Sequence, residues 1–289
     1  MKLALGTVQF GLDYGISNTL GRTPVDEAAR ILADAMRAGV DTLDTAAAYG
    51  QSEQVLGQIG VCGWKVVSKV PPLPSNAEDG RDWVREHVRR SCETLKVRRL
   101  EGLLLHRASD LIGPHGAEVA VGLREAREQG LVEKIGYSIY APQSLGELTR
   151  VMKPDLVQAP FSVLDQRLVS SGWLARLVDA GVEVHARSIF LQGLLLMGPG
   201  QRPAFFDRWQ ALWGRWDALV EANGGSALSV CLGFATAQPG LSRIVVGVEH
   251  QGHLQQLLAA WRDAGPVGMA HEVSCEDPQL VEPVNWVSA

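Results

Sequence analysis

The chain has 289 residues, of which 46% are hydrophobic and 20% are charged, the ordinary balance of a globular protein with a sizeable core. Its formal net charge of −5 argues against a nucleic-acid scaffold, because binding phosphate backbones requires a surplus of basic residues. No run of about 18 apolar residues occurs, so no membrane-spanning helix is predicted.

Short apolar runs alternate with longer amphipathic segments along the chain. The apolar runs predict strands at residues 3–7, 42–46, 65–70, 100–106, 134–139, 156–160, 183–188 and 243–248. The longer patterns predict helices at residues 25–38, 83–95, 117–129, 145–152, 174–180, 227–237 and 253–262. Trp209, Trp213 and Trp216 are spaced to share one helical face, which indicates core packing rather than ligand stacking.

Strands that alternate with helices and show no break in composition predict one (β/α)8 TIM barrel over residues 1–289, with an irregular tail from about residue 265. An open doubly wound sheet is the alternative. A dinucleotide-binding sheet of that kind carries a GxGxxG turn after its first strand. Residues 6–11, GTVQFG, do not fit this spacing, so the barrel is the better prediction.

The cysteines are few and widely separated: Cys62, Cys92, Cys231 and Cys275. No CxxC pair occurs, so neither a metal site nor a disulfide framework is expected. Free thiols indicate a reducing compartment, and the N-terminus shows no signal-peptide pattern. We therefore expect a cytoplasmic protein with a small-molecule substrate and no nucleic-acid or membrane partner; the oligomeric state is not predicted.

Polar residues gather where three successive predicted strands end. Asp44 ends the second strand, with Tyr49 in the loop after it, while Lys69 and His106 end the third and fourth strands. The loops after the strands build the active sites of barrel enzymes. A single ionisable residue at such a position is usually a structural ion pair, but four of types that suit proton transfer indicate catalysis.

The chemistry that these four residues suit is proton transfer to a carbonyl oxygen. A phenol is a weak acid at neutral pH, but an ammonium about 4 Å away stabilises the phenolate by about 4 kcal/mol at an effective dielectric constant near 20. Lys69 is the candidate ammonium for Tyr49, and Asp44 would keep it charged. His106 could donate a hydrogen bond that orients the substrate oxygen. Together they form an acid for a carbonyl that accepts hydride, or a base for the reverse reaction.

These segments resemble the aldo/keto reductase family. The signature is DTAAAYGQSE at residues 44–53, followed by Leu56-Gly57; SKV at residues 68–70 and LLLH at residues 103–106 match the lysine and histidine segments. The resemblance covers nearly the whole chain. It implies that Tyr49 is the general acid, that Lys69 and Asp44 tune it, and that His106 orients the carbonyl. It also implies a nicotinamide cofactor bound across the barrel mouth, NADP(H) with NAD(H) as the alternative.

The resemblance further implies a set of cofactor-binding positions. These are Gly6, Thr7, Asp44, Ser138, Gln158, Arg187, Ser188, Ile189, Leu191, Gly193, Gly247, Val248, Glu249, His253 and Gln256. Ser138 and Gln158 fit the positions that hold the nicotinamide carboxamide, although the usual asparagine beside the serine is Ile139 here. Arg187 stands where many relatives have an aromatic residue, and its planar guanidinium can stack in the same way.

The segment at residues 246–257 matches the place where relatives bind the adenosine 2′-phosphate. NADPH-specific relatives often have a lysine and an arginine there, and this chain has Gly247 and His253. Amides at a helix N-terminus could still hold a phosphate, but Glu249 would repel it. The NADP(H) expectation therefore comes from the resemblance.

Substrate residues are expected in the loops and the tail, where Tyr14, Arg107 and Trp286 are the candidates. Arg107 and Arg187 together suggest an anionic substrate, although they could equally serve the cofactor or the surface.

Two further interpretations remain open. A barrel lyase or aldolase could use Lys69 to form a Schiff base with its substrate. The second interpretation is a barrel that binds nicotinamide without catalysing a reaction.

Overall fold

The strands form a closed parallel barrel. The computed structural model describes residues 1–286. Each strand pairs with its neighbours in chain order, and β1 also pairs with β8, which closes the cylinder. The predicted single-domain (β/α)8 barrel is confirmed. The strands are β1 (Leu3–Gly6), β2 (Thr42–Asp44), β3 (Lys65–Val70), β4 (Leu100–Leu105), β5 (Val132–Ser138), β6 (Leu156–Pro160), β7 (Glu183–Arg187) and β8 (Arg243–Gly247).

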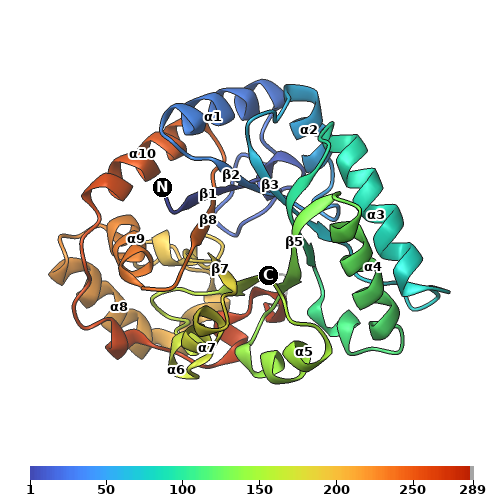
Figure 1. The fold of residues 1–289 in the computed structure, drawn as a ribbon. Coiled ribbons are helices and arrows are strands. Elements are labelled where there is room, and N and C mark those ends of the chain that lie inside the picture. The colour runs from blue at the N-terminus through green and yellow to red at the C-terminus, as the bar shows by residue number, and fades with distance from the viewer. Residues whose placement is uncertain (287–289) are drawn as a thin grey trace.

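Helices surround the barrel, as the view along its axis shows (Figure 1). The helices are α1 (Val25–Arg37), α2 (Ser52–Ile59), α3 (Gly80–Leu95), α4 (Gly116–Glu128), α5 (Leu145–Val151), α6 (Arg167–Ser170), α7 (Trp173–Asp179), α8 (Gln210–Ala222), α9 (Ala227–Ala237), α10 (Gln251–Asp263) and α11 (Pro278–Val281).

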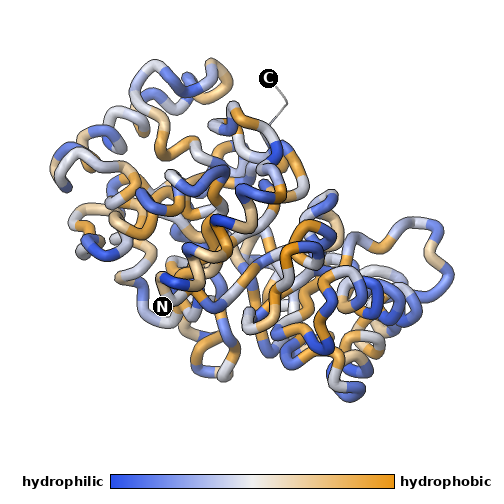
Figure 2. The backbone as a smooth tube through the Cα atoms, turned by 90° about the horizontal axis from the view of Figure 1, so that it is seen from above, coloured by the Kyte–Doolittle hydropathy of each residue, from blue (hydrophilic) through white to orange (hydrophobic). Residues whose placement is uncertain are grey.

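Each outer helix buries one stripe against the strands. In α1 the buried residues are Ala28, Ile31, Leu32 and Ala35, which recur at the spacing of one helical face. Hydrophobic and hydrophilic residues alternate along the outer helices (Figure 2). Inside the barrel, Val67, Leu104 and Leu156 form a separate apolar cluster. The interior is therefore filled, and a ligand can bind only at the ends of the strands.

Helix α2 was not predicted, because its buried face begins with polar residues. The Ser52 hydroxyl lies 2.8 Å from both the Thr7 carbonyl oxygen and the Thr7 hydroxyl. Glu53 is buried, with Ser68 donating a 2.6 Å hydrogen bond to it. These contacts satisfy the buried polar groups, but they remove the apolar periodicity on which a helix prediction rests.

The predicted tryptophan face is confirmed for two of the three rings. Trp213 and Trp216 are buried in a second hydrophobic cluster, together with Leu280 and Val281 of α11. Trp209 is only partly buried, and its indole donates to a carboxylate. The cluster fixes the segment after α10, which passes α8 and ends near the strand ends (Figure 1). The predicted irregular tail thus contains short helical turns.

Within residues 1–286, no single helix is long and apolar enough to cross a membrane. Two successive helical segments, residues 204–222 and Ala227–Ala237, reach that length and hydropathy together but are bent by 86°.

Candidate active site

A long cavity of about 1190 Å³ opens at the carboxyl ends of the strands. Most of the sequence-predicted site residues line it. They are Gly6, Thr7, Tyr14, Asp44, Tyr49, Lys69, His106, Ser138, Gln158, Arg187, Ser188, Ile189, Gly193, Gly247, Val248, Glu249, His253 and Gln256. Residues from every strand end thus meet at one mouth. In the described part of the chain, no group of three or more His, Cys, Asp or Glu side chains could hold a metal ion.

The ammonium of Lys69 is held by three oxygen atoms. Its Nζ lies 2.6 Å from Asp44 Oδ1, 3.0 Å from the Thr45 carbonyl oxygen and 3.4 Å from the Tyr49 hydroxyl. An ammonium has three hydrogens to donate, so each contact uses one of them. Lys69 is only 1% exposed and Asp44 only 3%, which leaves the Tyr49 hydroxyl as the part of the group nearest the cavity.

Asp44 keeps Lys69 protonated in this buried position. Burial by itself lowers the pKa of a lysine, but the nearby Asp44 carboxylate and Tyr49 oxygen outweigh it and raise the pKa of Lys69 above its usual value. The second carboxylate oxygen of Asp44 accepts a 2.7 Å hydrogen bond from Gln158. A fixed positive charge therefore lies beside the Tyr49 oxygen.

His106 is a neutral imidazole at the same end of the cavity. Its ring meets the Tyr49 ring edge-on, with the centroids 5.5 Å apart. Burial, reinforced by the charges of Lys69 and Arg187, lowers the pKa of His106 to about 4. A neutral imidazole has one N–H, which can donate to an oxygen in the cavity.

Two buried glutamine oxygens in the cavity wall lack a partner. Gln158 Oε1 makes no hydrogen bond beside Asp44, and neither does Gln9 Oε1, which lies beside Gly247. Unpaired buried acceptors are costly unless a donor reaches them. A nicotinamide carboxamide supplies such a donor, and Ser138 lines the cavity nearby. A nicotinamide carboxamide therefore fits the donors and acceptors in this part of the cavity wall.

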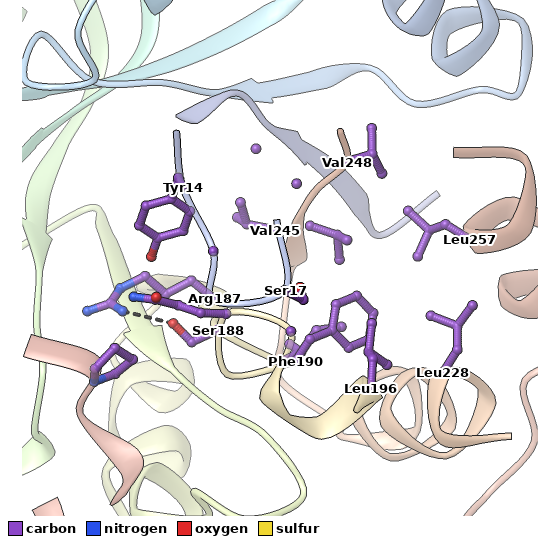
Figure 3. Close-up of a pocket in the computed structure, with 18 of the residues that line it drawn as sticks. Tyr14, Ser17, Arg187, Ser188, Phe190, Leu196, Leu228, Val245, Val248 and Leu257 are labelled. Carbon is purple, nitrogen blue, oxygen red and sulfur yellow. Dashed lines mark hydrogen bonds between the residues drawn. The ribbon is translucent and has the colours of Figure 1, made fainter. Parts of the chain in front are cut away.

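Arg187 lies at the catalytic end of the cavity. Its guanidinium lies 4.8 Å from the centroid of the Tyr140 ring and donates to the Ser188 hydroxyl and the Ile139 carbonyl (Figure 3). No carboxylate among the described residues pairs with it. The charge is therefore available to a ligand.

The loop after β7 is held in a strained conformation and contacts the loop after β1. Ser188, Leu191 and Gln192 have φ angles of 60°, 46° and 54°, a region that side chains disfavour. The Ile16 amide donates to the Gln192 carbonyl, and a Cβ at Gly193 would stand 1.9 Å from the Ser17 hydroxyl. The two loops therefore pack tightly across the cavity.

The opposite end of the cavity is formed by α8, α9, α10 and the residues after β8. Glu249 and His253 line this end, with Glu249 Oε2 3.8 Å from His253 Nδ1. Gly247 cannot carry a side chain here, because a Cβ would lie 2.4 Å from Gln9 Oε1.

Most amides at the start of α10 have protein acceptors. The Gln251 amide donates to Glu27 Oε1 at 2.6 Å, and the His253 amide donates to His250 Nδ1 at 3.3 Å. Among the described residues, the Gly252 amide between them has no acceptor.

Three sequence-predicted residues lie outside the cavity. Arg107 turns away and donates to Asp110 at 2.6 Å and to the Leu73 carbonyl, so it does not add a second arginine to the mouth. Trp286 packs against Phe206 with the centroids 4.9 Å apart. Leu191 is fully buried in the second hydrophobic cluster.

Sequence reasoning missed several residues of the cavity wall. Tyr140 and Gln192 line the end of the cavity that contains Tyr49, Gln9 lies beside Gly247, and Pro283 and Val284 approach from the tail. Tyr140 lies two residues after the end of β5 and Gln192 in the loop after β7, positions that could have identified them. The tail reaches the cavity through Pro283 and Val284 rather than through the expected Trp286.

A closed barrel with a large cavity at the carboxyl ends of its strands places the chain among the (β/α)8 proteins that bind small molecules at this face. The sequence model of the Aldo/keto reductase family matches residues 2–264. The chain belongs to this family and is an oxidoreductase of carbonyl compounds.

Similar proteins include a 6-dehydroglucose reductase from Novosphingobium aromaticivorans. It is 25% identical over 255 residues, which cover 82% of this chain and 80% of the relative. Among solved structures, the holo form of aldo-keto reductase AKR11C1 from Bacillus halodurans has a TM-score of 0.73 at 20% identity and covers 99% of this chain and 93% of its own. An aldo-keto reductase from Pseudomonas aeruginosa has a TM-score of 0.67 at 23% identity, with coverages of 91% and 90%. The two structures support the fold.

Proposed function

We propose that this aldo/keto reductase reduces an aldehyde or ketone to an alcohol, with a nicotinamide dinucleotide as hydride donor and Tyr49 as proton donor. The observation that supports the proposal is the buried Lys69 ammonium, 2.6 Å from Asp44 and 3.4 Å from the Tyr49 hydroxyl. A lysine held charged beside a phenol at a cavity wall suits the transfer of a proton to a carbonyl oxygen. The family resemblance implies NADP(H), with NAD(H) as the alternative.

Each residue around Tyr49 has a separate role in the proposed reaction. A bound nicotinamide would supply a hydride to the carbonyl carbon. Negative charge then develops on the carbonyl oxygen, and the Tyr49 hydroxyl donates its proton to that oxygen, which completes the alcohol. The Lys69 ammonium stabilises the anion left on Tyr49, and Asp44 keeps the ammonium charged. The neutral His106 donates a hydrogen bond to the carbonyl oxygen and orients it.

Ser138 and Gln158 are proposed to hold the carboxamide. Gln158 Oε1 is an unpaired acceptor in the cavity wall, next to Asp44. The catalytic end has a polar wall that includes Tyr14, Gln192 and Arg187, which suits a small polar carbonyl compound. Sugar-derived carbonyl compounds are the first substrates to test, because one relative is a 6-dehydroglucose reductase. We place the activity in the cytoplasm, since the four cysteines are free thiols.

A Schiff-base lyase is less compatible with Lys69. An amine must lose its proton before it attacks a carbonyl, and such lysines have lowered pKa values. The environment of Lys69 raises its pKa instead, and all three of its donors are in use.

The test is the oxidation of NADH and NADPH by the purified protein with a panel of aldehydes, ketones, sugar-derived carbonyl compounds and pyridoxal. Carbonyl-dependent oxidation of either dinucleotide is the expected result. Borohydride trapping of substrate on Lys69 without any nicotinamide would contradict the proposal in favour of the lyase. Tight binding of a dinucleotide without turnover across the panel would favour the non-catalytic barrel.

A further inference from the structure

The cavity has two chemically different ends. Figure 3 shows Tyr14 and Arg187 on one side, Val248 and Leu257 on the other, and Phe190 between them. The first end contains the Lys69–Tyr49 group and the unpaired guanidinium of Arg187. A dinucleotide whose nicotinamide lies by Tyr49 therefore extends its adenosine toward the second end.

The charged side chains at this second end of the cavity are mostly acidic. Glu249, Glu221 and Asp217 line it, and none of the described residues that line it is a lysine or an arginine. Asp217 is bound by Arg202, which neutralises that carboxylate, but the charges of the two glutamates have no arginine or lysine partner in this wall. His253 adds no compensating charge near neutral pH, because burial and the neighbouring His250 lower its pKa.

The N-terminus of α10 offers little to a phosphate. Its first amide, that of Gln251, is bound by the Glu27 carboxylate at 2.6 Å, and the amide of His253 is bound by His250 Nδ1. A phosphate would have to displace Glu27 and would meet a second negative charge at Glu249. Helix amides attract anions only where they are unoccupied, and among the described residues of this turn that leaves only the Gly252 amide. A lysine at position 247 would not fit either, because Gln9 fills that space.

We propose that this end of the cavity selects NADH over NADPH, with the Glu249 carboxylate accepting hydrogen bonds from the adenosine ribose hydroxyls. The inference rests on the proposed function and names its cofactor. A carboxylate suits a ribose diol, whose hydroxyls are donors, whereas the 2′-phosphate of NADPH would place like charges together at a cost. For this chain the proposal favours NADH over the NADP(H) that the family resemblance implies.

The experiment measures the dissociation constants of NADH and NADPH for the wild type by isothermal titration calorimetry at pH 8, which keeps Glu249 ionised. NADH is expected to bind at least about tenfold more tightly, equivalent to ~1.4 kcal/mol. In Glu249→Gln the dissociation constant of NADH should rise about tenfold, and that of NADPH should fall. In Glu249→Lys the preference reverses.

Glu86 supplies the matched control. It is exposed on α3, on the other side of the barrel from α10 (Figure 1), so Glu86→Gln and Glu86→Lys make the same charge changes away from the cavity. Both control variants should keep the wild-type ratio of the two constants. Thermal unfolding checks that each variant is folded.

The outcomes distinguish a failure of the NADH inference from a failure of the proposed function. Equal or tighter binding of NADPH by the wild type overturns the inference while the proposed function stands. An NADH preference that Glu249→Gln leaves unchanged overturns the role of Glu249. Failure of both dinucleotides to bind overturns the proposed function itself.

Discussion

Replacing Lys69 with methionine removes the ammonium while keeping a side chain of similar length. Lys69 Nζ lies 3.4 Å from the Tyr49 hydroxyl oxygen. At an effective dielectric constant near 20, a unit charge at this distance stabilises an anion on that oxygen by about 5 kcal/mol. The Asp44 carboxylate repels the same anion and offsets part of this stabilisation. A net loss of about 2–3 kcal/mol corresponds to a roughly 30- to 150-fold slower proton transfer.

The assay is single-turnover reduction of a carbonyl substrate with the dinucleotide prebound, so that product release does not mask the chemical step. Lys69→Met should react roughly 30- to 150-fold more slowly than the wild type. Lys69→Arg keeps a cation, so its rate should lie between those of the wild type and Lys69→Met.

Removing Lys69 leaves Asp44 buried without its partner, so each variant must be shown to be folded and to bind the dinucleotide. A folded Lys69→Met protein that keeps more than half of the wild-type rate would refute the electrostatic reasoning. A Lys69→Arg variant as slow as Lys69→Met would contradict it as well.

Three further predictions concern residues around this group. Arg187→Gln should reduce kcat/KM for an acidic aldehyde about tenfold more than for its neutral analogue, because a charged hydrogen bond of about 1.5–3 kcal/mol is lost; equal reductions would show that Arg187 serves the cofactor. His106 has a pKa of about 4 in the fold against 6.5 ordinarily, so the unfolded chain binds a proton that the fold does not between these values. Acidification from pH 6.5 to 4 should therefore lower the free energy of unfolding by up to about 3 kcal/mol more in the wild type than in His106→Gln, measured by urea titration. Arg167 is buried with Asp165 at 2.8 Å and Glu282 at 2.7 Å. Arg167→Met should cost about 3–5 kcal/mol in the same titration, and a cost below about 1 kcal/mol would show that the tail is anchored by the apolar cluster alone.

The sequence was sufficient to predict the barrel and the meeting of Asp44, Lys69 and His106 at one end of it. Asp44, Lys69 and His106 come at the ends of consecutive strands, and neighbouring parallel strands bring their carboxyl ends to one edge. This relation depends only on chain order. The meeting of these side chains can therefore be predicted when the predicted strand boundaries are accurate to within a residue or two.

The sequence was insufficient where a side chain's direction depends on its tertiary partners. His106 faces the cavity, whereas Arg107, the next residue, is exposed and bound by Asp110. Successive residues of an extended chain point to opposite sides, so adjacency alone did not place Arg107 at the mouth. The partner of the Gln251 amide could not be predicted either, because Glu27 lies more than two hundred positions earlier in the chain.

Replacing Tyr49 with phenylalanine tests the account most directly, since it removes one hydroxyl and no charge. Tyr49→Phe should bind the dinucleotide within about twofold of the wild type, while its single-turnover rate of carbonyl reduction falls by at least about 100-fold, the usual contribution of a general acid. A folded variant that retains more than about a tenth of the wild-type rate would show that another group donates the proton.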